Sequence, residues 1–97
     1  MTDFALMTWS GDRLVSYEPL TSDTTEGAIS FVHGLLSERT RNHARWLVKM
    51  GVHYVLDHGH HEPDMLIVGP RISVGTWHLT EVEGQAKLRW EPERQSG

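Results

Sequence analysis

Hydrophobic side chains spaced three and four residues apart mark the stretch from Asp23 to Gly51 as one long amphipathic helix. Projected at about 100° per residue, these side chains fall within an arc about 120° wide. The arc contains Ala28, Ile29, Val32, Leu35, Leu36, Trp46, Leu47 and Met50. Because the spacing keeps its phase across the polar residues 37–45, we expect one continuous helix, with a break near residues 40–42 as the alternative. The arc predicts that this face, Trp46 included, packs on a sheet.

Signals for a helix start and a helix end lie at the two limits of this stretch. Asp23 and Glu26 have the spacing of a capping box, and Thr24 and Thr25 are alternative capping residues. Gly51 follows the last turn, where glycine readily takes the left-handed conformation that ends a helix. These signals give the predicted helix its limits.

The other hydrophobic segments are short, are bounded by Gly and Pro turn signals, and predict strands. They are Phe4–Trp9, Leu14–Glu18, Val52–Asp57, Met65–Val68, Ile72–Thr80 and Ala86–Glu91. The last of them alternates most clearly, with one face apolar and the other charged. Its apolar residues are Ala86, Leu88 and Trp90, and its charged residues are Lys87, Arg89 and Glu91.

A β-hairpin, one long helix and then about four strands predict an α+β fold with two layers. In this fold the helix packs on one face of a mainly antiparallel sheet of about five to six strands. Residues 1–91 are expected to form a single domain, and residues 92–97 a flexible C-terminal tail.

Composition narrows the classes of protein to which this chain could belong. The 97 residues include no cysteine, which excludes disulfides, zinc–thiolate sites and thiol nucleophiles. Residues 1–12 lack a basic region ahead of an apolar segment, and no apolar run approaches the length of about 18 residues that spans a membrane. We therefore expect a cytoplasmic protein that does not contact a membrane.

Charge is distributed unevenly along this acidic chain. The net charge is -4, which argues against general nucleic-acid binding. Basic residues nevertheless concentrate on the second half of the predicted helix, where Arg41, Arg45 and Lys49 follow one another at intervals of four. This row is either a solvated helix face or a binding surface, and nucleic-acid binding through its phosphate contacts is an alternative function.

Arg39 and His43 interrupt the apolar face of the predicted helix. They lie four residues apart and therefore on one side of the helix. A buried arginine without a partner costs several kcal/mol. Either a carboxylate from the sheet pairs with these residues, or this part of the helix faces another molecule.

A loop rich in histidine follows the predicted strand that ends at Asp57. Its residues His58, His60, His61 and Asp64 offer the nitrogen and oxygen ligands that zinc or nickel accept. The loop lacks the H-E-x-x-H spacing of metalloproteases, because a proline follows His61-Glu62. We expect no cofactor, and the alternative is a zinc or nickel site, with or without metal-dependent catalysis, in this loop.

Catalytic motifs fail their spacing tests in this chain. His78-Leu79-Thr80 matches the H-x-T triplet of two-histidine phosphoesterases, but such enzymes carry two triplets and this chain has one. There is no G-x-S-x-G sequence and no phosphate-binding glycine loop. The favoured function is therefore non-enzymatic protein binding, as in inhibitors, immunity proteins and phage or bacterial accessory proteins.

Tryptophan and arginine are enriched at the residues that dominate protein interfaces. On this ground the expected partner-binding residues are Arg39, Arg41, His43, Arg45 and Trp77. The expected partner is another protein, and a homodimer is a second expectation because a small sheet leaves edges to pair.

Overall fold

The structure is a computed structural model that describes residues 2–59 and 72–93. Its strands are β1 (Thr2–Ser10), β2 (Arg13–Ser22), β3 (Val52–His58), β4 (Ile72–Val82) and β5 (Gln85–Pro92). Its helices are α1 (Thr25–Thr40) and α2 (Ala44–Lys49). The predicted strand at residues 65–68 and the last four residues of the predicted 92–97 tail lie outside the described residues, whereas Pro92 belongs to β5.

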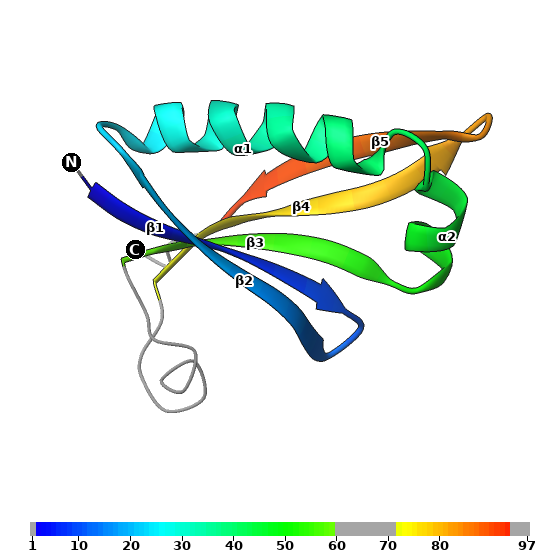
Figure 1. Cartoon of the computed structure of the whole chain (residues 1–97), viewed down its shortest axis with the longest axis horizontal. Coiled ribbons are helices and arrows are strands. Elements are labelled where there is room, and N and C mark those ends of the chain that lie inside the picture. Colours follow the sequence, from blue (N-terminus) through cyan, green and yellow to red (C-terminus); the bar gives the residue numbers. More distant parts are fainter. Residues whose placement is uncertain (1, 60–71, 94–97) are drawn as a thin grey trace.

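The strands form one antiparallel sheet in the order β2-β1-β3-β4-β5, and α1 lies along one face of it (Figure 1). This confirms the predicted α+β architecture with a helix packed on one sheet face. Strand β2 extends to Ser22 and so includes Pro19, beyond the end of the predicted strand Leu14–Glu18. Proline cannot donate a ladder hydrogen bond, and it is tolerated here because β2 lies at the edge of the described sheet.

The prediction of one continuous helix is wrong, and the alternative of a break near residues 40–42 is correct. Helix α1 starts at the cap Thr24, whose hydroxyl accepts a hydrogen bond from the Gly27 amide at 2.9 Å. It ends at Thr40, which is buried and donates its hydroxyl to the carbonyl of Leu36 at 2.8 Å. A turn over residues 41–43 then changes the chain direction before α2 begins.

The change of direction decides which side chains of α2 reach the sheet. Ala44 is buried and Leu47 packs against the core, whereas Trp46 and Met50 are 61% and 47% exposed. The prediction that Trp46 packs on the sheet is therefore wrong. The apolar arc holds within α1, where Ala28, Val32 and Leu36 are fully buried, and it loses its phase at the break.

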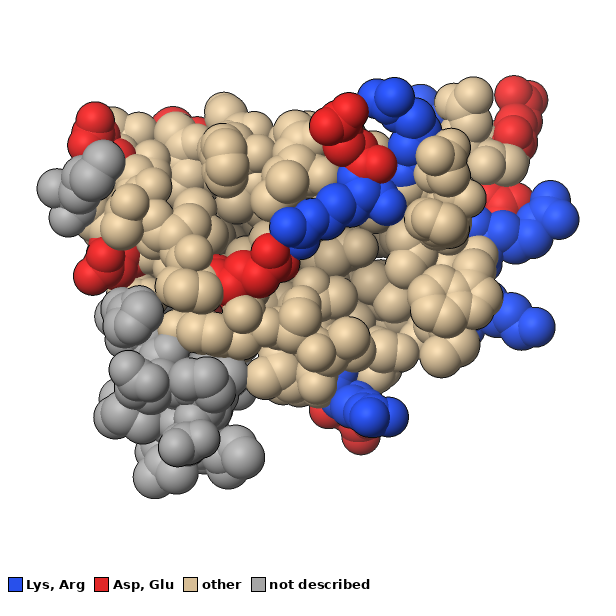
Figure 2. Space-filling view, in the orientation of Figure 1, with Lys and Arg blue, Asp and Glu red and all other residues tan. Residues whose placement is uncertain are grey.

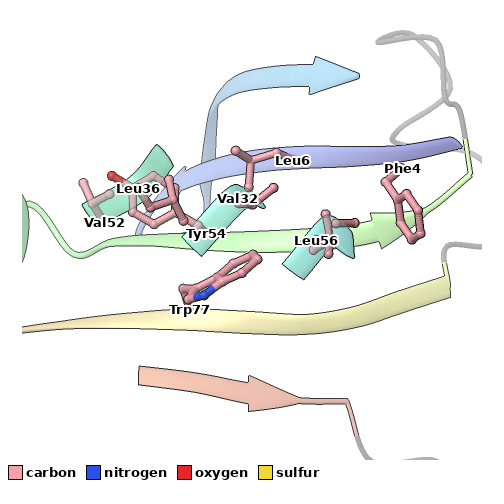
Figure 3. Packing of buried hydrophobic residues seen from close by; sticks show 9 residues of the cluster. Phe4, Leu6, Val32, Leu36, Val52, Tyr54, Leu56 and Trp77 are labelled. Carbon is pink, nitrogen blue, oxygen red and sulfur yellow. The ribbon is translucent and has the colours of Figure 1, made fainter. Parts of the chain in front are cut away.

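The core lies between α1 and the sheet (Figure 3). Trp77 of β4 is its largest side chain and is 0% exposed, packed with Phe4, Leu6, Tyr54 and Leu56 of the neighbouring strands and with the buried face of α1. Its burial corrects the expectation that Trp77 belongs to a partner-binding surface, because a side chain without exposed area cannot touch a partner. Strand pairing explains the burial of Trp77, because it lies opposite Tyr54 of β3 on one side and opposite Trp90 of β5 on the other.

Strand β5 has the alternation that its sequence predicts. Ala86, Leu88 and Trp90 are partly buried, and the residues between them are exposed. The turn before it consists of Glu83 and Gly84, both with positive φ, 53° and 80°. Two such residues form the tight turn that suits the twist of a hairpin. Among the described residues, no helix is long and apolar enough to cross a membrane.

Candidate functional site

Trp46 lies between two hollows at the end of the molecule that carries α2. The first is an apolar hollow of about 370 Å³ between α2 and the β1–β2 hairpin. Its apolar lining consists of Leu14, Val15, Trp46, Leu47, Met50 and Val52 together with the ring of Tyr54. Val15 is 59% exposed, so this hollow is continuous with exposed hydrophobic surface on both of its walls.

The second hollow, on the other side of Trp46, is polar and basic. It has a volume of about 480 Å³ and is lined by Asn42, His43, Ala44, Arg45, Trp46, Lys49 and Gly84. None of these lining residues is acidic, whereas two are cationic. Glu81 lies 3.6 Å from Arg45, but the Arg45 side chain is 85% exposed, so that pair contributes little and leaves the guanidinium accessible.

A third hollow is a groove of about 640 Å³ between α1 and β5. The helix and its C-cap contribute His33, Ser37, Thr40 and Arg41, and the strand contributes Gln85, Ala86, Lys87 and Leu88. Asn42 lines both this groove and the basic hollow, just as Trp46 lines both the basic hollow and the apolar one. The three hollows therefore form one continuous region around the α1–α2 break, which we name the junction surface.

Among the residues that the structure describes, several cations lie close together on this surface. In Figure 2 the Lys and Arg side chains in view lie toward the end that carries α2, among some Asp and Glu, whereas the opposite end shows Asp and Glu but no Lys or Arg. The lining of the groove and of the basic hollow contains four cations, Arg41, Lys87, Arg45 and Lys49, and no carboxylate. Arg41 is 3.9 Å from Glu38, and both side chains are largely exposed. Such an ion pair is weak and leaves the Arg41 guanidinium accessible to a partner. An acidic chain therefore presents a locally basic surface.

Arg39 has a different role from the other basic residues. Its guanidinium donates two hydrogen bonds to the carboxylate of Glu18 on β2, at 2.6 and 2.8 Å. The sheet therefore supplies the acid for Arg39, which is one of the two alternatives that the sequence leaves open. His43, the other residue that interrupts the apolar face, is exposed at the start of α2 and lines the basic hollow.

The bidentate pair shifts the ionisation of its members. The hydrogen bonds and charge of Arg39 hold the pKa of Glu18 below its ordinary value of 4.5, although partial burial opposes this. Burial raises the pKa of the nearby Tyr54 phenol, and Arg39 opposes that change. The pair therefore favours the ionised carboxylate in the folded state.

We predict that Glu18→Gln lowers the free energy of unfolding at about pH 7 by no more than about 1 kcal/mol, since both side chains are partly exposed. A lowered pKa in the folded state gives stability that is present above the unfolded value and is lost as pH falls through the folded value. The difference between the two proteins should therefore shrink as pH falls below the ordinary value of 4.5 and vanish once Glu18 is protonated in the folded state as well. Urea denaturation at a series of pH values measures it.

Glu38→Gln is the matched control for this prediction. It removes a carboxylate whose nearest cation, Arg41, is 3.9 Å away, so its denaturation midpoint should match that of the unchanged protein at every pH. A Glu18→Gln variant whose loss of stability persists in acid would contradict a role for ionised Glu18.

The predicted metal-binding loop is described only at its first residue. His58 ends β3, is exposed, and has its ring edge-to-face with Phe4 at 5.1 Å between centroids. His60, His61 and Asp64 lie outside the described residues. Within residues 2–59 and 72–93, no group of three or more His, Cys, Asp and Glu side chains could hold a metal ion. A zinc or nickel site in this loop stays a prediction.

His78, the histidine of the H-x-T triplet, lies on the sheet face opposite α1. Its Nε2 is 3.0 Å from a carboxylate oxygen of Glu91 on β5, and it faces His53 across β3 and β4. The side chain is partly exposed, and the hollow beside it also contains Thr76 and Glu93. This is a strand histidine paired with a neighbouring acid.

The sequence pattern missed two features of the junction surface. It assigned Trp46 and Met50 to the packed arc of a continuous helix, and it gave Val15 no role. The alternative of a helix break was the signal that could have placed Trp46 outside the core. Comparison of the chain with protein-family models, curated proteins and solved structures finds no match.

Proposed function

We propose that this chain is a small protein-binding module and that its contact surface is the junction surface, with Trp46 at the centre. The observation that carries the proposal is the exposure of Trp46, which is 61% exposed between an apolar and a basic hollow. A tryptophan can bury roughly 150–250 Å² in an interface. Such a residue, flanked by exposed Val15 and Met50 and bordered by polar side chains, is typical of an interaction site.

The charges around Trp46 support a partner with acidic groups. Arg45 and Lys49 line the basic hollow together with His43, and Arg41 lines the adjoining groove. Complementary charge speeds association and selects partners more than it adds affinity. Arg41, His43 and Arg45 therefore keep the partner-binding role expected from the sequence, whereas Trp46 takes the place of buried Trp77 and Arg39 pairs with Glu18.

Trp46→Ala is expected to weaken partner binding by about 2 kcal/mol, or roughly thirtyfold in Kd, as loss of a central interface tryptophan does. Arg45→Glu is expected to slow association and to reduce its dependence on salt. The measurement is affinity capture from the native host with the full chain as bait, followed by titration of the purified partner against each variant.

Phe31→Ala is the matched control, because Phe31 is 64% exposed on α1 and lines none of the three hollows. It removes an exposed aromatic ring elsewhere and should leave the affinity unchanged. A partner that binds Trp46→Ala and Arg45→Glu as tightly as the unchanged protein would exclude the junction surface. Light scattering of Trp46→Ala tests whether the partner is a second copy of the chain.

A further inference from the structure

Strand β5 has a free edge within the described sheet. Strand order places β4 on one side of β5, and no described residue pairs with its other side. The opposite edge strand, β2, is protected by Pro19 and by a change of register opposite Thr8 and Trp9. Prolines and bulges are devices that prevent an edge from pairing, and β5 has neither between Gln85 and Glu91.

The tight turn determines which backbone groups of β5 point outward. Val82 and Gln85 flank the two turn residues, so they form the hydrogen-bonded pair that closes the hairpin. Because hydrogen-bonded and non-hydrogen-bonded pairs alternate along an antiparallel ladder, the amides and carbonyls of Ala86, Leu88 and Trp90 point away from β4. Ala86 and Leu88 both line the groove, so this part of the free edge borders it.

The helix forms a polar wall beside this edge. His33 and Ser37 of α1 and its C-cap residue Arg41 follow one another at intervals of four and line the groove. The Trp77 indole donates to His33 Nδ1 at 3.1 Å, so the proton of the neutral imidazole is on Nε2 and that nitrogen is a donor. At the other edge of the sheet, Arg39 of α1 donates to the carboxylate of Glu18 on β2.

Charge indicates what could occupy the groove. Its lining contains the cations Arg41 and Lys87 and no carboxylate. A second copy of β5 is a poor occupant, because antiparallel pairing centred on Leu88 places Lys87 opposite Arg89 of the other copy, and like charges in that position destabilise the pair. Acidic side chains on an added strand would instead face cations.

We infer that the free edge of β5 and the adjoining groove accept an extended acidic segment of a partner protein as an additional strand. Outward backbone groups supply the affinity of such strand addition, and the flanking side chains supply its selectivity. The inference rests on the proposed function, because it assigns the conformation and charge of the partner segment. Since Asn42 joins the groove to the basic hollow, the same segment continues toward Trp46.

A displayed library of random peptides, selected on the full chain, provides the probe. The selected peptides are expected to be richer in Asp and Glu than the library and to slow hydrogen exchange of the Ala86, Leu88 and Trp90 amides. Ala86→Pro removes one outward N–H at an edge position where proline is tolerated, and should weaken the selected peptides about tenfold. Ala86→Val keeps the N–H and is the matched control, with unchanged affinity.

Three results would each overturn the inference: no peptide selected, equal binding to Ala86→Pro and the unchanged protein, or no slowed exchange on β5. Exchange that slows with protein concentration alone would assign the edge to a second copy and would also overturn it. Peptides that lose affinity with Trp46→Ala but not with Ala86→Pro would leave the proposed function standing without strand addition. Circular dichroism of each variant confirms that it is folded before binding is compared.

Discussion

Replacing Trp77 by alanine is expected to lower the free energy of unfolding by about 3–5 kcal/mol. The side chain is 0% exposed, lies in the centre of the core and packs against Trp90 at 4.4 Å between ring centroids. Its removal would leave a cavity beneath α1 and would also free His33 Nδ1 from its hydrogen bond. A small domain has about 5–15 kcal/mol in total, so the loss should be large in urea denaturation followed by circular dichroism.

Two further variants separate the burial of Trp77 from other effects. Trp46→Ala makes the same substitution at a residue that is 61% exposed, and its free energy of unfolding should change by about 0.5 kcal/mol or less. Trp77→Phe keeps most of the apolar area, loses the indole donor, and should fall between the two. Equal losses for Trp77→Ala and Trp46→Ala would mean that α2 packs its tryptophan inward.

The two tryptophans also show where sequence reasoning succeeds and where it fails. Local patterns predicted the strands among the described residues, the glycine turn before β5 and the two faces of β5, because alternation and turn chemistry are set by neighbours along the chain. They also placed Gly51, with φ of 69°, at the end of the helical stretch. The α+β architecture followed from the order of these elements.

The break between α1 and α2 depends on contacts that the local pattern does not contain. Thr40 and Ala44 are buried on either side of the turn between the helices, and the strands that α2 contacts, β3, β4 and β5, come later in the chain. Once the phase of the arc is broken, Trp46 leaves the core and the basic row of Arg41, Arg45 and Lys49 is divided between two hollows. The sequence therefore indicated the basic residues that line the junction surface and missed its exposed tryptophan.

The position of Trp77 and the partner of Arg39 also depend on contacts between residues far apart in the sequence, in this case the pairing of strands across the sheet. Register places Trp77 opposite Tyr54, on the face that α1 covers, and it places Glu18 of the edge strand within reach of the helix. The sequence could state that a buried or partly buried arginine needs an acid. It could not name the acid, because Glu18 and Arg39 are 21 residues apart and belong to different layers.

Gly75→Ala is expected to lower the free energy of unfolding by about 2–3 kcal/mol, a large effect for one methyl group. Gly75 pairs with Leu56 of β3 and Pro92 of β5, and the Trp90 ring lies over it. An added Cβ would be 2.6 Å from Trp90 Cζ2 and 2.7 Å from the Glu91 carbonyl oxygen. The ring could move only by giving up its contact with Trp77, and the carbonyl belongs to the adjacent backbone, so β5 itself must shift.

Gly34→Ala is the matched control and should have the opposite sign. Gly34 is exposed within α1, and a Cβ added there meets nothing within 4 Å. Because alanine favours the helix over glycine, this change should raise the free energy of unfolding by about 0.5–1 kcal/mol. Urea denaturation of both variants measures the pair, and the Trp90 indole resonance should shift in Gly75→Ala alone. If Gly75→Ala were neutral or stabilising, the close packing of Trp90 on β4 would be wrong, and with it the register that directs Ala86 and Leu88 toward the groove.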